Sequence, residues 1–161
     1  MDFEETYAAC FHRVYRFALS MTRSPHEAEE IAQETFFRAI RHFDDLPPDA
    51  AVEAWLMRIA RNVHISRLRK AHRETPREHL PESPSEEDVE ARLVSSDQAQ
   101  GVLRALHDLE EPYKEVFTLR ALGDVPYRQI GALFGKGESW ARVVYYRARM
   151  MLIRLSEKEN E

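Results

Sequence analysis

The feature that most constrains this chain is a stretch rich in proline and acidic residues, from residue 75 to residue 96. It contains three prolines among serines, and residues 74–97 carry eight acidic side chains against two arginines. Such a composition buries little apolar surface and favours an extended, mobile chain. It predicts two small domains, residues 1–73 and residues 98–161, joined by a flexible acidic linker over residues 74–97.

Both flanking parts carry the periodicity of helices. Residues 56–63 place apolar side chains on one helical face, and Ser24-Pro25 supplies an N-cap followed by proline at the first helical position. The chain has five glycines and no stretch that alternates strictly between apolar and polar residues, which argues against a sheet. The predicted fold class is all-α. In the first domain, the expected helices span residues 2–21, 25–43 and 52–72.

The second domain ends in the pattern of a helix-turn-helix. Pro126 begins a short amphipathic helix, residues 135–137 form a glycine-containing turn, and Ser139 can cap a longer basic helix that runs to about residue 155. An ordinary helical hairpin with a basic surface is the alternative. Spacing leaves two buried faces open for the last helix: Trp140, Val144, Ala148 and Met151, or Ala141, Tyr145, Ala148 and Leu152.

The distribution of charge indicates nucleic acid as a partner, although the formal net charge is -5. Residues 51–73 hold six basic side chains and one acid, and residues 128–154 again hold six and one. Contact with phosphate depends on the local electric field, so the two basic patches indicate a nucleic-acid partner more strongly than the net charge argues against one.

Several classes of function are excluded by what the sequence lacks. Cys10 is the single cysteine, the seven histidines are scattered, and no phosphate-binding loop or nucleophile–base pattern is present. We therefore expect no enzyme, no metal, no cofactor and no small-molecule ligand. The acidic start and the lack of an apolar run of about 20 residues predict a cytoplasmic protein without membrane insertion.

Two further stretches combine the residue types of a binding surface. Residues 55–62 bring tryptophan, asparagine and two arginines onto one helix, which suits stacking on unpaired bases and contact with phosphate. Residues 28–37 bring acids and aromatic residues together, which suits docking of a basic partner. The alternatives are a core tryptophan with solvated arginines, and a solvated acidic helix.

Taken together, these stretches resemble the extracytoplasmic function group of bacterial sigma factors. Glu-Ala-Glu-Glu-Ile-Ala-Gln-Glu-Thr-Phe at residues 27–36 is similar to the polymerase-docking helix of that group. Trp-Leu-Met-Arg-Ile-Ala-Arg-Asn at residues 55–62 resembles the promoter-opening helix. Tyr-Arg-Gln-Ile-Gly-Ala-Leu-Phe-Gly at residues 127–135, followed by Arg-Ala-Arg at residues 147–149, resembles the C-terminal helix-turn-helix. The order of the three stretches also agrees.

The resemblance implies three binding surfaces. The expected contacts with core RNA polymerase are Glu30, Gln33, Glu34 and Phe37. The expected contacts with the minus-ten promoter element are Trp55, Arg58, Arg61, Asn62 and Arg69, with the loop of residues 44–54 holding a base flipped from the non-template strand. The expected contacts with the minus-thirty-five element are Arg142, Val143, Tyr146, Arg147 and Arg149, which favours the second buried face above.

The resemblance also implies partners: core RNA polymerase, promoter DNA and an anti-sigma protein that covers both domains. Two other functions fit parts of the pattern, namely a sigma-factor mimic that sequesters an anti-sigma protein and a free-standing helix-turn-helix regulator. One departure stands out, since the group often has an aspartate after the asparagine of the promoter-opening helix and this chain has Ser66.

Overall fold

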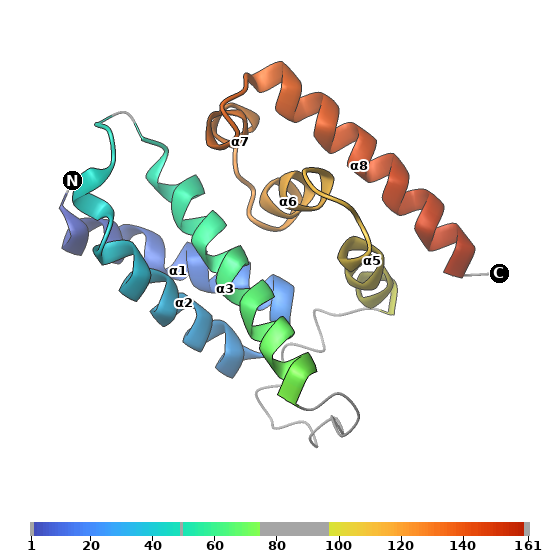
Figure 1. The fold of residues 1–161 in the computed structure, drawn as a ribbon, viewed down its shortest axis with the longest axis horizontal. Helices are drawn as coiled ribbons and strands as arrows, with labels where there is room; N and C mark the ends of the chain where they lie inside the picture. The colour runs from blue at the N-terminus through green and yellow to red at the C-terminus, as the bar shows by residue number, and fades with distance from the viewer. Residues whose placement is uncertain (1, 49, 75–96, 160–161) are drawn as a thin grey trace. The chain divides into compact units, whose positions relative to one another are not determined.

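A computed structural model describes residues 2–48, 50–74 and 97–159 (Figure 1). These residues form helices and turns and contain no strand, which confirms the all-α prediction. One compact unit contains α1, α2 and most of α3, and the other contains the helices from α5 to α8. The predicted linker lies almost wholly at residues 75–96, outside the described ranges.

In the first unit, α1 and α2 are defined by their caps. Helix α1 (Phe3–Thr22) begins with a capping box, in which the side chain of Asp2 accepts from the backbone N–H of Glu5 and the carboxylate of Glu5 accepts from that of Asp2. Helix α2 (Pro25–Ile40) is capped by Ser24, whose hydroxyl accepts from the backbone N–H of Glu27 as predicted. Arg23, in the left-handed conformation with φ 58°, ends α1, so the two helices follow one another almost directly.

The end of α2 differs from its predicted position. The helix stops at Ile40 rather than Phe43, and a 3-10 turn, η1 (Phe43–Asp45), follows. The ring of Phe43 lies 5.6 Å from that of Phe3, and this contact takes Phe43 off the helical path. Helix α3 (Val52–Glu74) then begins where the sequence predicts and runs two residues further.

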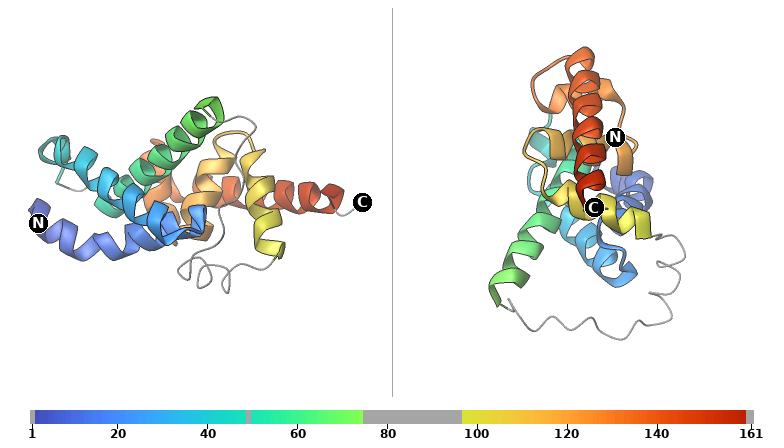
Figure 2. Two further views of the ribbon diagram at one scale, coloured as in Figure 1. Left: turned by 90° about the horizontal axis from the view of Figure 1, so that it is seen from below. Right: turned by 90° about the vertical axis from the view of Figure 1, so that its right-hand side faces the viewer.

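Phe36 is the centre of the aromatic packing in the first unit. Its ring centroid lies 4.9 Å from that of Tyr7, 5.8 Å from that of Phe11 and 6.3 Å from that of Phe3. Only 3% of Phe36 is exposed. These pairs fix α2 against α1, beside which it lies in both views of Figure 2. The other large buried side chains of this unit include Val14, Phe17, Ile31, Leu56, Met57 and Val63.

The second unit is organised around its last helix. Helix α8 (Glu138–Glu159) packs along α5 (Asp97–His107), α6 (Tyr113–Phe117) and α7 (Tyr127–Leu133). A π-helical turn, η2 (Thr118–Leu122), extends α6. The apolar core at the α5 end of α8 is formed by Ala105, Leu106, Leu109, Ala148 and Leu152.

Helices α7 and α8 form the predicted helix-turn-helix. Gly135 takes a φ of +67° in the turn, and the N–H of Lys136 donates to the carbonyl of Gly131 at 2.8 Å. Helix α8 begins at Glu138, so Ser139 lies in its first turn and the prediction of Ser139 as the cap is wrong. Backbone from Gly137 approaches α7 closely there: a Cβ on Gly131 would lie 2.5 Å from the carbonyl oxygen of Gly137.

Candidate interfaces for polymerase and promoter DNA

The four side chains predicted to contact polymerase lie on the outward side of α2. Gln33 and Phe37 are exposed, Phe37 to 63%, and Glu30 and Glu34 are half-buried. Glu34 pairs with Arg38 at 2.7 Å, and the guanidinium of Arg41 lies 5.0 Å from the ring centroid of Phe37. An exposed phenylalanine among paired charges is suited to a protein contact, because burying its ring on binding is favourable.

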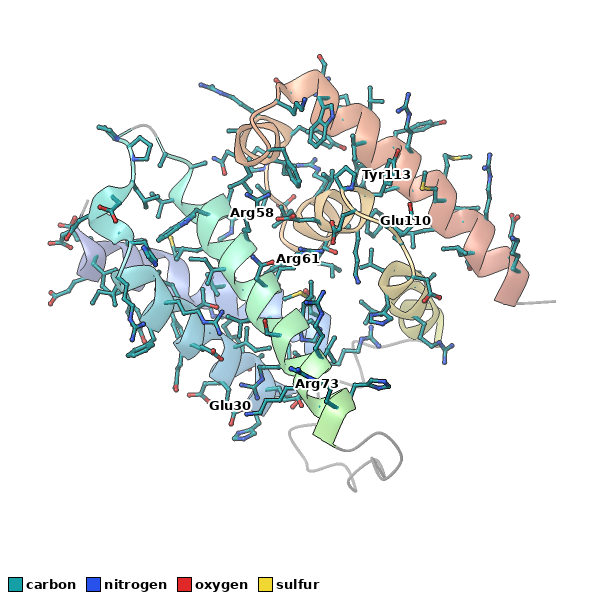
Figure 3. The ribbon with its side chains drawn as sticks, viewed as in Figure 1. Glu30, Arg58, Arg61, Arg73, Glu110 and Tyr113 are labelled. Atoms are coloured by element: carbon teal, nitrogen blue, oxygen red, sulfur yellow. The ribbon has the colours of Figure 1, made fainter. Side chains whose placement is uncertain are left out.

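Glu30 differs from its three neighbours because it bridges two helices. Arg67 of α3 donates a hydrogen bond to Oε2 of Glu30, and His26 lies 3.0 Å from Oε1. The hydrogen bond from Arg67 has the largest effect on the pKa of Glu30 and lowers it. Desolvation raises the pKa, but the charges of Arg67 and His26 and the hydrogen bond with His26 also lower it, so the pKa lies below its usual value. Figure 3 shows Glu30 on α2. The residue predicted to bind polymerase therefore also ties α2 to α3.

This bridge predicts a pH dependence of stability. Because the pKa of Glu30 is lower in the folded chain, its ion pair stabilises the fold above a pH of about 4.5 and is lost as the pH falls through the lowered folded pKa. Glu30→Gln should therefore cost at most about 1 kcal/mol at pH 7, and less as the pH falls below 4.5. Urea unfolding across this pH range measures the difference. A difference that stays constant with pH, or that persists in an Arg67→Met background, would contradict this assignment.

The residues predicted to contact the minus-ten element come from successive turns of α3. Asn62 and Arg69 are exposed, Trp55 and Arg58 are half-buried, and Arg61 is largely buried. Nη1 of Arg61 lies 3.4 Å from Oδ1 of Asn62. Figure 3 labels Arg58 and Arg61, one turn apart on this helix.

A pocket of about 400 Å³ lies beside two of these residues. Trp55, Ile59 and Asn62 line it from α3, and Arg38, Arg41 and His42 line it from the end of α2 and the residues that follow. An aromatic face, an amide and two guanidinium groups are the donors and stacking surface that a nucleobase and its phosphate need. The sequence did not predict the contribution of α2, because a loop and the first turns of α3 separate Arg38 and Arg41 from Asn62 along the chain.

Helix α8 presents an exposed face that contains all five residues predicted to contact the minus-thirty-five element. Arg142, Val143, Tyr146, Arg147 and Arg149 are exposed, Tyr146 to 61%. The opposite face is buried, and its residues are Ala141, Val144, Ala148 and Leu152. This agrees with the second predicted face, except that Val144 is more buried than Tyr145. The outward face combines arginines with an aromatic ring and a valine, which can contact phosphates, guanine edges and thymine methyl groups.

Two family descriptions match the chain in the order of its two units. Sigma-70 region 2 matches residues 6–74, and Sigma-70 region 4 matches residues 99–152. The first match contains the α2 face and the pocket, and the second contains the helix-turn-helix. A region 2 followed by a region 4 defines the class of sigma-70 sigma factors.

Relatives of the chain place it within this class. It is 31% identical to the ECF RNA polymerase sigma factor SigM of Bacillus subtilis over 94% of the chain and 93% of that relative. It is 30% identical to the ECF sigma factor SigE of Mycolicibacterium smegmatis over 87% of the chain and 56% of that relative. The chain belongs to the extracytoplasmic function (ECF) group of RNA polymerase sigma factors.

Two solved structures share the fold over 97% of the chain at 24% sequence identity. One is the sigma factor RpoE in complex with the anti-sigma factor NepR from Bartonella quintana, with a TM-score of 0.60. The other is CnrH in complex with the cytosolic domain of CnrY, with a TM-score of 0.62. Among the helices described for this chain, none is both long and apolar enough to cross a bilayer.

Proposed function

We propose that this sigma factor binds core RNA polymerase through the outward face of α2 and directs it to promoters that α3 and α8 recognise. The observation that carries the proposal is the division of α8 into two faces. Its apolar small residues are buried, and its arginines, Val143 and Tyr146 point outward. A helix whose outward face is basic and aromatic has the side chains that enter a major groove.

Polymerase docking is assigned to Glu30, Gln33, Glu34 and Phe37. Phe37 supplies exposed apolar area, and the three polar side chains around it can exchange their present partners for basic groups of the polymerase. The ion pair of Glu30 with Arg67 makes this residue the most costly of the four to redirect. We therefore expect Phe37 to contribute most of the binding energy.

Opening of the minus-ten element is assigned to α3 and the pocket beside it. Trp55 offers a stacking face, Asn62 offers an amide for a base edge, and Arg38 and Arg41 offer charge for the flanking phosphates. Capturing a base that has left the duplex offsets the stacking energy that is lost when it flips. We place Arg58 and Arg69 along the strand on either side. Arg61 is largely buried and donates to Oδ1 of Asn62, so we assign it to positioning that amide.

The domain boundaries that we propose are residues 1–73 for polymerase and minus-ten binding, 74–97 for the linker, and 98–161 for minus-thirty-five binding. We also propose regulation in the cytoplasm by an anti-sigma protein, since the sigma factor RpoE has been solved with the anti-sigma factor NepR. A mimic or a free-standing regulator is not favoured, because the matched regions and the relatives are those of sigma factors.

The test is runoff transcription with purified core polymerase on a pool of genomic promoter fragments, with and without this chain. Discrete transcripts that depend on the chain support the proposal and give the promoter elements. Binding to core without transcripts would favour the mimic, and failure to bind core would favour the free-standing regulator.

Asn62→Ala should impair promoter opening more than polymerase recruitment. Asn62 lines the pocket and is exposed, so its loss removes a base contact, and with it the oxygen that accepts from Arg61, without leaving a cavity in the core. Permanganate reactivity of unpaired thymines should fall by about 5–150-fold, corresponding to about 1–3 kcal/mol for a lost base contact, while closed-complex formation stays within about twofold. Unchanged opening would remove Asn62 from this role.

A further inference from the structure

The side chain of Arg142 is fixed by two neighbours although it lies on the exposed face of α8. Its Nη2 is 2.9 Å from Oε1 of Glu138, one turn earlier, and the two side chains are 61% and 52% exposed. Its Cζ is 5.2 Å from the ring centroid of Tyr127, the first residue of α7. An arginine held by a carboxylate and an aromatic face at once retains few of its rotamers.

Tyr127 is itself held in place from behind. Its ring meets that of Tyr145 edge-on at 5.8 Å, and Tyr145 stacks on Phe117 at 5.4 Å with an angle of 10° between the planes. The guanidinium of Arg120 lies 4.4 Å from the centroid of the Tyr127 ring and donates to the carbonyl of Val125. The ring that orients Arg142 is therefore anchored in the packing between α6 and α8.

We propose that Glu138 is a specificity-determining residue and that Tyr127 is a positioning residue, both acting through Arg142. The proposal deepens the assignment of α8 as the minus-thirty-five reader and rests on it. Glu138 competes with DNA for Arg142, and Tyr127 keeps the guanidinium plane where a base edge can meet it.

The physical basis is the difference between a phosphate and a base pair as a partner for Arg142. Every sequence offers phosphates, but a phosphate must draw Arg142 away from Glu138 and leaves the carboxylate near the negative backbone. A guanine accepts from Arg142 at O6 and N7, and the amino group of a nearby cytosine donates to Glu138. The intact pair can thus read a guanine and a neighbouring cytosine, and it disfavours all other DNA.

The experiment measures DNA binding by the holoenzyme of core polymerase and the full chain. The probes are a promoter fragment found by runoff transcription and the same fragment with its upstream element scrambled, each titrated with salt. Glu138→Gln should bind the scrambled DNA about 3–10-fold more tightly and should gain no affinity for the promoter, so that the promoter-to-scrambled ratio falls by at least that factor. The dependence of log affinity on log salt should steepen by about 0.9 for scrambled DNA, because one more cation reaches a phosphate.

A double-mutant cycle separates this mechanism from simple removal of charge. Both Glu138 and Arg142 are exposed, so their variants should fold. If Glu138 acts mainly through Arg142, Glu138→Gln should raise the affinity for scrambled DNA by less than about twofold in an Arg142→Ala background, the remainder being its direct repulsion by the backbone. An equal gain in affinity for scrambled DNA in both backgrounds overturns the proposal for Glu138.

Tyr127 is tested by two substitutions that differ in one property. Tyr127→Phe keeps the ring face, and Tyr127→Leu removes it. Tyr127→Leu should lower promoter affinity as much as Arg142→Ala does, and the double variant should bind no more weakly than Arg142→Ala alone. Tyr127→Phe should bind the promoter as wild type does. A loss with leucine that remains in the Arg142→Ala background shows a structural role and overturns the positioning role.

Failure of this inference can be told apart from failure of the proposed function. If Arg142→Ala and Arg147→Ala both leave the promoter-to-scrambled ratio unchanged, α8 does not read the element, and the function assigned to it is wrong together with the inference. If Arg142→Ala lowers the ratio and Glu138→Gln does not, the proposed function stands and the role of Glu138 is rejected.

Discussion

Replacing Phe36 with alanine should destabilise the first unit by about 3–5 kcal/mol, the usual cost of removing a buried phenylalanine. Phe36 is 3% exposed, and its ring meets those of Phe3, Tyr7 and Phe11. The variant leaves a cavity between α1 and α2 that three rings of fixed geometry cannot fill. Urea unfolding followed by the fluorescence of Trp55, in a Trp140→Phe background, reports on this unit.

Phe37 provides a matched control because it is the next residue and the same side chain. It is 63% exposed, so Phe37→Ala should change the unfolding free energy by less than about 0.5 kcal/mol. The same substitution should weaken binding to core polymerase at least tenfold, if the α2 face docks there. A stable Phe37→Ala variant that binds core as tightly as wild type would contradict the docking role, and an unaltered stability of Phe36→Ala would contradict the packing described for the first unit.

Gly131→Ala should destabilise the helix-turn-helix by about 1–3 kcal/mol, in the range of overpacked sites. The added Cβ would lie 2.5 Å from a backbone oxygen of Gly137 and 2.9 Å from that of Lys136. Backbone on both sides of the turn must then separate, and α8 must shift against α7. Trp140, whose ring lies 5.1 Å from that of Phe134 beside the turn, reports this unfolding in a Trp55→Phe background.

Gly101→Ala is the control for this change, and its expected sign is opposite. Gly101 lies inside α5, and no atom would lie within 4 Å of an added Cβ. Alanine there should stabilise the second unit by about 0.5–1 kcal/mol through helix propensity. Equal effects at the two positions would show that the close approach at Gly131 does not limit the fold.

Local signals in the sequence predicted the helices because caps and periodicity act within a few residues. The N-cap at Ser24 and the start of α3 at Val52 are confirmed. The predicted end of α2 lies too far along the chain. The observed end depends on the contact of Phe43 with Phe3, and Phe3 lies 40 residues earlier in the sequence. Helical periodicity leaves two alternative sets of residues for the buried face of α8, because adjacent faces of a helix overlap.

The candidate sites likewise combine features that local patterns predict with features that they do not. The outward position of Phe37 and of Tyr146 follows from helical periodicity, and their exposure agrees with it. The pairing of Glu30 with Arg67 and the joining of Arg38 to the pocket of Trp55 depend on how two helices cross. No local pattern encodes that crossing, so these contacts could not be predicted from the sequence.

The two faces of α8 separate what keeps this unit folded from what it recognises. Ala141, Ala148 and Leu152 hold the helix in place, while Val143, Tyr146 and Arg147 lie exposed on the opposite face. If α8 reads the minus-thirty-five element as proposed, changes at the outward positions can therefore alter the promoters that are chosen without weakening the scaffold. A lineage, or a library built in the laboratory, could retarget this protein to new genes by substituting a handful of surface residues on a single helix.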